Sequence, residues 1–388
     1  MNFTFLHCAD LHLGSPMVGL SLKDERIAEK FSAASREAFA NLISRALEER
    51  VAFVLIAGDV YDGEQRDNSI GLFFCKQVSR LAQMGIPAYL VLGNHDAASI
   101  VTKTIRPPSN VRQFPTDRAR TEEIADLRVA IHGRSFSHRA VDENWVIDYP
   151  APRAGWFNIG LLHTSVEGNA RHATYAPCSV ADMAARGYDY WALGHVHDFR
   201  ELSREPRIVF PGNLQGRSVR ETGPKGAVFV DVRDGRVERV RREIVDRARW
   251  VEARVDVSSA DTLEDALELI VETLRAPLAD AVGRMAAVRV LLTGATSLHT
   301  RLRAERSRLA DETQARTYDL HDDVWIETLR IETRSLDIGQ AGPDLTGIDL
   351  EATLAECAVD PEIRRRAREM IGQIAARLPA GAPPALQG

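Results

Sequence analysis

Apolar runs alternate with amphipathic stretches along the N-terminal part of the chain. The runs at 3–10 (FTFLHCAD), 51–59 (VAFVLIAGD) and 87–96 (PAYLVLGNHD) are largely apolar and close on polar residues, a pattern typical of buried strands. Residues 22–50 and 67–84 instead place apolar side chains at helical spacing, with charged residues between them. This strand–helix–strand–helix–strand order predicts the beginning of an α/β domain.

Shorter apolar runs, without long helices between them, follow from about residue 124. Polar loops that contain Gly and Pro separate these runs, as expected between strands. The expected strands are 127–133, 157–164, 188–197, 207–212 and 226–232. They predict a second sheet, and together with the N-terminal segments they predict a large domain over residues 1–248.

The composition changes again near residue 250, where a separate small domain is expected over 249–338. Its predicted elements are a strand at 251–257, a helix at 262–278, a strand at 286–294, a helix at 298–317 and a strand at 324–335. Residues 339–388 follow as a Gly/Pro-rich linker (339–347), a basic helix (361–378) and a tail rich in Pro, Ala and Gly. The helix is a candidate for docking on a partner or on DNA, and the tail is expected to be disordered.

The 388 residues are 45% hydrophobic and 27% charged, the composition of a folded globular protein. No apolar run reaches about 18 residues, so no membrane-spanning helix is expected. The four cysteines are widely spaced and the N-terminus lacks a signal-peptide pattern, which favours a cytoplasmic protein without disulfides. The net charge of −6 neither establishes nor excludes a nucleic-acid partner, because bound divalent cations would add positive charge that this count omits.

Five short polar motifs stand where five different strands are predicted to end. They are ADLH at 9–12, GDVYD at 58–62, GNHD at 93–96, LLHT at 161–164 and GHVH at 194–197. Side chains at the carboxyl ends of strands in an α/β fold converge on one crevice. Alternation along an extended chain would also turn Asp10 with His12, and His195 with His197, to the same side. One motif alone arises easily by chance, but five in order predict a single site.

Seven residues of these motifs offer the oxygen and nitrogen ligands that suit Mn²⁺, Fe or Zn²⁺, and no thiolate is among them. They are Asp10, His12, Asp59, Asn94, His163, His195 and His197. Because seven ligands exceed what one ion needs, the sequence predicts two ions that share a carboxylate and act on a phosphate ester. His95 then remains for proton transfer to the phosphate or the leaving oxygen, with Asp96 expected to hold its tautomer.

The order D-x-H, G-D-x-x-D, G-N-H-D, H and G-H-x-H resembles that of the calcineurin-like metallophosphoesterase superfamily. The opening FLHCADLHLGSP and the segment FPGNLQGRSVRETGPKG at 210–226 are more narrowly similar to the SbcD-type DNA-repair exonucleases. The resemblance covers about residues 1–245. It implies a four-layer α-β-β-α sandwich with a small C-terminal α+β capping domain that binds DNA.

This resemblance also implies a role for each motif residue. One ion would be held by Asp10, His12, Asp59 and His197, and the other by Asp59, Asn94, His163 and His195. His95 would be the catalytic histidine, while Asp62 matches a second aspartate that is expected to brace its loop. The implied activity is a Mn²⁺-dependent DNA exonuclease or phosphodiesterase in DNA repair. The implied partners are DNA and an SbcC-type, SMC-like ATPase, and a homodimer is a further option.

Arginines flank the last metal motif and are candidates for contacting a phosphate backbone. Of these, Arg217 and Arg220 follow the GNLQG loop and are expected to bind substrate. The alternative is a solvated surface on which glutamates such as Glu221 pair with the arginines. His7, on the first strand, is expected to be a core histidine or to lie behind the site.

Two other functions stay open on the sequence alone. One is the same chemistry on a small phosphomonoester or cyclic nucleotide. The other is a DNA-end-binding scaffold for an SMC-like ATPase, without cleavage.

Overall fold

The computed structural model of the protein describes residues 1–15, 25–62, 67–166, 175–336 and Arg365. The chain divides into two compact units, residues 1–335 and 336–388. Nearly all of the second unit lies outside the described residues, and with it the predicted linker, basic helix and tail.

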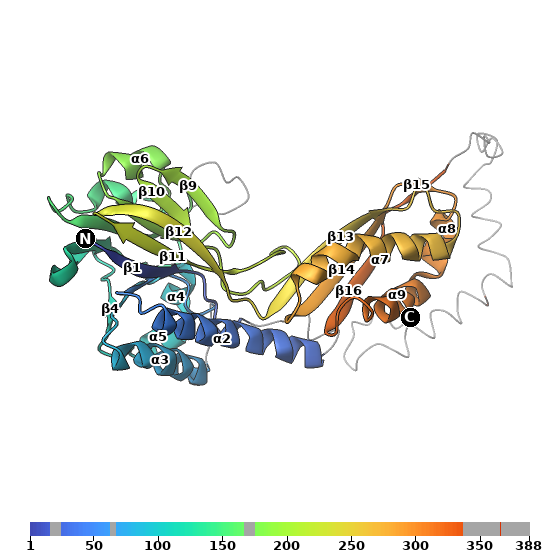
Figure 1. The fold of residues 1–388 in the computed structure, drawn as a ribbon, viewed down its shortest axis with the longest axis horizontal. Coiled ribbons are helices and arrows are strands. Elements are labelled where there is room, and N and C mark those ends of the chain that lie inside the picture. Colours follow the sequence, from blue (N-terminus) through green and yellow to red (C-terminus); the bar gives the residue numbers. More distant parts are fainter. Residues whose placement is uncertain (16–24, 63–66, 167–174, 337–364, 366–388) are drawn as a thin grey trace. The chain divides into compact units, whose positions relative to one another are not determined.

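A mixed sheet of six strands forms around the N-terminal strand, in the order β12-β11-β1-β2-β3-β4 (Figure 1). β1 (Phe3–Cys8), β2 (Val54–Ala57), β3 (Ala88–Val91) and β4 (Val111–Gln113) run parallel. The late strands β11 (Gly226–Arg233) and β12 (Arg236–Ile244) add antiparallel on the β1 side. The segment 226–232, predicted to join the second sheet, therefore belongs to the first, because it pairs with β1.

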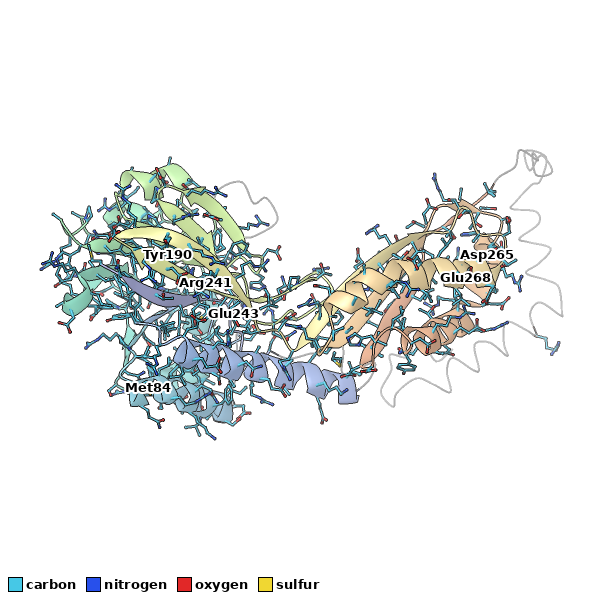
Figure 2. All side chains as sticks on the ribbon, in the orientation of Figure 1. Met84, Tyr190, Arg241, Glu243, Asp265 and Glu268 are labelled. Atoms are coloured by element: carbon cyan, nitrogen blue, oxygen red, sulfur yellow. The ribbon has the colours of Figure 1, made fainter. Side chains whose placement is uncertain are left out.

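A second sheet of six strands has the order β5-β6-β7-β8-β10-β9. Its central strands β6 (Val129–Gly133), β7 (Phe157–His163), β8 (Tyr190–Gly194) and β10 (Arg207–Phe210) are parallel. The edge strands β5 (Arg120–Ile124) and β9 (Arg200–Arg204) are antiparallel to their neighbours. The two sheets share an apolar core that includes Phe5, Phe53, Leu161 and Tyr190, the last labelled in Figure 2.

Helices pack against the other face of each sheet. α2 (Glu25–Glu48) and α3 (Asn68–Gln83) share a core with the first sheet, in which Phe39 and Phe74 stack 5.6 Å apart. α6 (Val180–Ala185) and the 3₁₀ turn η2 (Trp145–Asp148) pack on the second sheet around Trp191. The predicted α-β-β-α layering is confirmed. No helix among the described residues is long and apolar enough to cross a membrane.

Residues 248–335 build a third sheet with its own apolar core. The strands β13 (Ala248–Asp256), β14 (Met285–Thr293) and β16 (Val324–Ile331) are all parallel, and α7 (Leu263–Asp280) and α9 (Arg306–Thr317) cross over between them. The helix predicted over 298–317 is two helices, α8 (His299–Ala304) and α9, because the backbone leaves the helical conformation at Glu305. A short parallel pair, β15 (Ala295–Thr296) with β17 (Arg334–Ser335), completes this part.

The predicted strands of the first sheet extend too far at their carboxyl ends. The strand predicted over 87–96 ends at Val91, and Gly93 caps the short helix α4 (Asn94–Ala98), which α5 (Ile100–Thr104) follows. GNHD is therefore the first turn of a helix. The apolar pattern does not show this boundary, because the apolar run continues through Leu92 into the cap.

Candidate metal centre

The five motif loops meet at the carboxyl ends of β1, β2, β3, β7 and β8. The backbone N–H of Asp10 donates to Gly58 O (2.9 Å), and that of His12 donates to Asp59 O (3.0 Å). The backbone N–H of His195 donates to both carboxylate oxygens of Asp10, at 3.1 and 2.9 Å. The convergence expected from the strand ends is present, with loops from both sheets.

Four of the candidate ligands sit in turns. Asp10, His12 and Asp59 have φ values of 52°, 42° and 53°, and His195 has a φ of 105°. Residues other than glycine rarely adopt positive φ, and none does so within a regular strand. The predicted convergence of Asp10 with His12, and of His195 with His197, is present. The predicted reason for it, alternation along a strand, is wrong. Tight turns after the strands bring these side chains together.

The first group of side chains contains Asp10, His12 and His197. The Nε2 atoms of the two histidines lie 3.2 Å apart, and His197 Nε2 lies 4.0 Å from Asp10 Oδ1. Asp10 and His12 are almost fully buried, with 1% and 2% of their surfaces exposed. One potential ligand atom from each of these three residues lies within 4.8 Å of the other two, so the three could share a metal ion.

The second group contains Asp59, Asn94 and His163, all buried. Asp59 Oδ2 lies 3.5 Å from His163 Nε2 and 3.8 Å from His12 Nε2, so this carboxylate faces both groups. Asn94 Oδ1 lies 2.9 Å from His163 Nε2. The ring of His195 lies 5.3 Å from that of His163, centroid to centroid. The structure therefore gathers all seven predicted ligands at one place.

The protonation pattern of these histidines shows that the centre suits cations. His163 Nδ1 lies 2.9 Å from Ala57 O and His197 Nδ1 lies 2.8 Å from Glu221 Oε1, so both Nδ1 atoms must donate. In the neutral ring each Nε2 then carries a lone pair. The lone pair of His163 faces the Asp59 carboxylate, and that of His197 faces Nε2 of His12. Acceptor atoms buried this close together repel one another unless a cation or a proton lies between them. Two divalent ions fit this set of ligands.

Burial and neighbouring charges shift the pKa values of the centre in opposite directions. Burial favours protonation of Asp59, but the charges of the surrounding histidines, His163 first, outweigh it and lower the pKa of Asp59 to about 2. Burial lowers the pKa of His12 to about 4 and raises the pKa of Asp10. Metal ions bind carboxylates in the ionised form and imidazoles in the neutral form, so metal binding at this centre would be coupled to the release of protons.

His95 stands beside these groups and is held by Asp62. Its Nδ1 lies 3.0 Å from Asp62 Oδ1, and the same oxygen lies 3.4 Å from His12 Nδ1. The neighbouring Asp62 carboxylate raises the pKa of His95. Asp62 also braces its loop as expected, because Ser15 Oγ donates to its other oxygen (2.7 Å).

The carboxylate of Asp96 is not seen to contact the His95 ring, so the interaction predicted to hold the tautomer of His95 is not formed. Its buried carboxylate accepts backbone N–H bonds from Val60 (3.2 Å), Tyr61 (3.0 Å) and Gly93 (3.0 Å). Adjacent residues in a helical turn point in different directions, so His95 and Asp96 do not face each other. Asp96 joins the GDVYD loop to the GNHD turn and thereby positions both.

The two predicted substrate arginines differ in their surroundings. Arg217 is half-buried at the centre, with its guanidinium 3.6 Å from Asp62 Oδ1 and 3.4 Å from Glu221 Oε1. Arg220 is exposed, and its guanidinium forms no ion pair with a described residue. Glu221 does pair with an arginine, Arg217, but it is largely buried and also contacts His197. The sequence gives no signal for this, because 24 positions separate Glu221 from His197.

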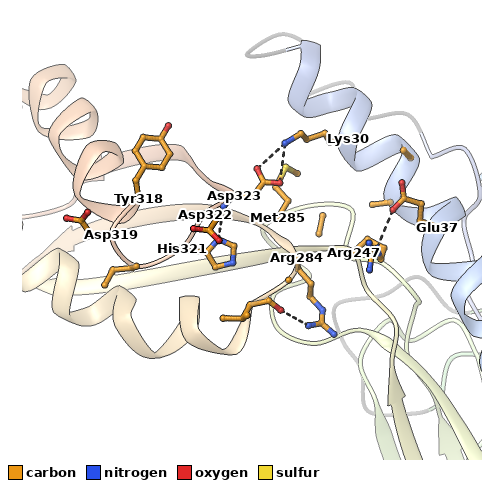
Figure 3. A pocket seen from close by; sticks show the side chains of 16 residues that line it. Lys30, Glu37, Arg247, Arg284, Met285, Tyr318, Asp319, His321, Asp322 and Asp323 are labelled. Carbon is orange, nitrogen blue, oxygen red and sulfur yellow. Dashed lines mark hydrogen bonds and ion pairs between the residues drawn. The ribbon is translucent and has the colours of Figure 1, made fainter.

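A cavity of about 520 Å³ lies elsewhere, between α2 and residues around β14 and β16 (Figure 3). Lys30 and Asp323 form an ion pair across it (3.0 Å), and Glu37 pairs with Arg247 (3.3 Å). None of the predicted ligands lines this cavity. Its size therefore does not identify it as the site of chemistry.

Comparisons with known proteins agree with this geometry. Residues 3–199 match the calcineurin-like phosphoesterase family, and residues 250–334 match the family described as metallophosphoesterase YhaO, middle domain. The uncharacterized metallophosphoesterase YhaO of Bacillus subtilis (strain 168) is 35% identical over 277 residues, which are 70% of this chain and 67% of that protein.

More distant relatives are DNA double-strand break repair proteins Mre11. The protein of Sulfurisphaera tokodaii is 23% identical over 241 residues (58% of this chain, 59% of that protein). The protein of Methanopyrus kandleri is 24% identical over 259 residues (61% and 52%). The match thus spans little more than half of each Mre11 protein. Because the phosphoesterase match covers more than half of the chain and includes all but the late strands of the sandwich, the chain belongs to the calcineurin-like phosphoesterase family.

Proposed function

We propose that the protein is a two-metal phosphodiesterase that hydrolyses DNA, as a Mn²⁺-dependent exonuclease in DNA repair. The observation that carries the metal-dependent chemistry is the convergence of imidazole lone pairs on buried carboxylates. The DNA substrate is supported by the relatives named Mre11. A cytoplasmic setting accords with the dispersed cysteines.

The chain's own residues divide the work between the metal ligands and one histidine that is not a ligand. The seven ligands would hold two divalent ions, which, when bound, supply activation of water and stabilisation of developing charge on the phosphate. His95 is 26% exposed and lies next to the ligands, of which His197 is 21% exposed and His12 and His163 are 2% and 0% exposed, so His95 can reach a substrate at the open side of the centre. Asp62 faces its Nδ1 at 3.0 Å, which leaves Nε2 to donate a proton to the leaving oxygen.

Arg217 and Arg220 are proposed to contact the phosphate backbone of the DNA. Arg220 is exposed on the loop that carries Arg217, and Arg217 lies within 3.6 Å of Asp62, next to the proposed proton donor. An SbcC-type ATPase and a second copy of the chain are proposed as further partners. Within α3, the apolar residues Ile70, Phe74 and Val78 are buried against the first sheet, so this face of the helix is not available to a second copy.

The test compares substrates with the purified chain and Mn²⁺. Duplex DNA, single-stranded DNA and a cyclic nucleotide are assayed for the wild type and for His95→Gln. We expect cleavage of DNA, with a loss of about 10²–10⁴-fold in kcat for H95Q and unchanged Mn²⁺ binding. Cleavage of the cyclic nucleotide alone would replace DNA by a small substrate. Chelator-insensitive DNA binding without cleavage would favour the scaffold.

A further inference from the structure

Within the part of the chain that the structure describes, one carboxylate from outside the five motifs, that of Glu221, contacts the centre. Its Oε1 lies 2.8 Å from His197 Nδ1. Only 15% of the Glu221 side chain is exposed, so it is not one of the solvated surface charges expected from the sequence. A half-buried acid directly behind a proposed ligand requires an explanation.

Glu221 is held in place by donors that leave it little freedom. Its Oε2 accepts from the backbone N–H of Arg217 (2.8 Å) and from Asn213 Nδ2 (2.9 Å). The Arg217 guanidinium lies 3.4 Å from Oε1. The backbone N–H of Glu221 donates to Ser218 O (2.9 Å), which closes the turn. A carboxylate fixed by donors on both oxygens can only accept, so the His197 Nδ1 beside it must carry a proton.

This contact decides which nitrogen of His197 can bind an ion. With the proton on Nδ1, the neutral ring presents its lone pair at Nε2, which faces Asp10 and His12. With the proton on Nε2, the same ring could not act as a ligand there. Partners of this kind orient metal-binding histidines and raise their basicity.

We propose that Glu221 is a positioning residue that keeps His197 in its metal-binding tautomer, with Asn213 and Arg217 fixing Glu221 in turn. This inference rests on the two-metal function proposed above. It concerns the metal centre only, so it does not depend on DNA being the substrate.

The Glu221→Gln variant tests this directly, because it keeps the shape of the side chain. The amide oxygen is expected to take the Oε2 position, where two N–H donors point at it, so the NH₂ group is turned toward His197 Nδ1. That nitrogen must then accept, and the proton of the ring moves to Nε2. Glu221→Ala instead removes the acceptor and lets both tautomers form. Glu201→Gln is the matched control, since Glu201 is also half-buried and pairs with Arg207 away from the centre.

Two measurements are made on the full chain. Long-range ¹H–¹⁵N spectra of the metal-free, histidine-labelled protein are expected to show His197 as the Nδ1–H tautomer in wild type and E201Q, and as the Nε2–H tautomer in E221Q. Calorimetric titration with Mn²⁺ alone is expected to show one of two sites weakened by about 10–100-fold in E221Q, and by a smaller factor in E221A.

An E221Q chain with the wild-type His197 tautomer and wild-type Mn²⁺ affinity would overturn the inference. A wild-type chain that binds no Mn²⁺ would overturn both this inference and the proposed function. A wild-type chain that binds two Mn²⁺ ions but cleaves no DNA would remove only the nuclease proposal.

Discussion

At the scale of single residues, the histidines of the centre take their protonation pattern from partners that lie far away in the sequence. Ala57 O fixes His163 and Asp62 holds His95, at 2.9 and 3.0 Å. The sequence shows which side chains can bind an ion, because their types and spacing are visible in it. It does not show which nitrogen of each ring is available, because the partner of Nδ1 comes from a distant segment.

The Asp62→Asn substitution tests the contact between Asp62 and His95, which the structure shows in place of the predicted contact between Asp96 and His95. Because Asp62 raises the pKa of His95, its removal lowers that pKa, and a histidine acting as an acid then loses its proton at lower pH. We expect the alkaline limb of the pH–kcat profile on a simple phosphodiester to move to lower pH, with kcat at neutral pH reduced. Asp117→Asn, an exposed substitution far along the chain, is the control. If Asp96→Asn moves the limb and D62N does not, the assignment of Asp62 is wrong.

His7 provides a separate pH prediction at the same scale. It is fully buried, between Tyr190 Oη (3.0 Å) and Leu193 O (3.1 Å), and burial lowers its pKa to about 3. A buried neutral histidine stabilises the fold fully above its unfolded pKa of about 6.5 and progressively less as the pH falls toward 3.

For wild type, His7 alone should therefore lower the free energy of unfolding by about 2 kcal/mol between pH 7.5 and pH 5. Urea titrations of wild type and His7→Gln at both pH values measure how much free energy of unfolding each protein loses between pH 7.5 and pH 5. The loss in wild type should exceed the loss in His7→Gln by this amount. Equal losses in the two proteins would show that His7 is already charged at pH 5 in the folded chain.

At the scale of elements, the apolar pattern predicts which strands and helices exist better than where they end. The long helices α2 and α3 lie within the predicted segments, and eight strands of the two sheets match predicted ones, but no strand was predicted at β4, β5, β9 or β12. The ends were missed at Asp10, Asp59 and Asn94, where turns or a short helix follow the strand. Positive φ at an aspartate has no signature in the sequence, since only tertiary contacts hold the residue in that conformation. For the same reason β11 could not be assigned to its sheet before its pairing with β1 was known.

Gly194, the last residue of β8, shows how closely two elements approach at the centre. A Cβ at this position would collide with Ala57 O and lie 2.9 Å from His163 Nδ1. Gly194→Ala should therefore push β2 and β8 apart and disturb the contact that fixes His163. We expect a loss of about 1–3 kcal/mol in the free energy of unfolding, together with weaker Mn²⁺ binding.

Gly85→Ala is the control for this substitution. Gly85 has a φ of 71°, but its added Cβ would meet nothing within 4 Å. It should cost about 1 kcal/mol through backbone strain alone and leave Mn²⁺ binding unchanged. Equal effects of the two variants on Mn²⁺ binding would contradict the role of Gly194 in packing at the centre.

At the scale of the whole molecule, the centre exists only because two sheets bring their strand ends together. Asp10, Asp59 and Asn94 follow strands of the first sheet, whereas His163 and His195 belong to the end of strands in the second. This arrangement destabilises the metal-free protein, because it buries carboxylates and imidazole lone pairs that repel one another. The net charge of −6 does not reveal this cluster, which explains why the overall charge says little about the substrate.

This repulsion leads to a prediction for the stability of the whole chain with and without metal. In Asp59→Asn, the amide oxygen can still accept from the backbone N–H of His95 (2.9 Å), while the NH₂ group can donate toward His163 Nε2 and His12 Nε2. The metal-free variant should therefore unfold at the same temperature as metal-free wild type or at a higher one. Ligands that bind only the folded state stabilise it, by about 2.7 kcal/mol at a hundredfold excess over Kd.

Wild type should accordingly gain several degrees in Tm with Mn²⁺ and lose them again with a chelator, whereas D59N should gain little. Thermal unfolding of both proteins, metal-free and at a series of Mn²⁺ concentrations, separates the two effects. A metal-free D59N that is much less stable than metal-free wild type would mean that Asp59 is required by the fold itself. In that case the lone pairs gathered at the strand ends would not be the reason for metal binding.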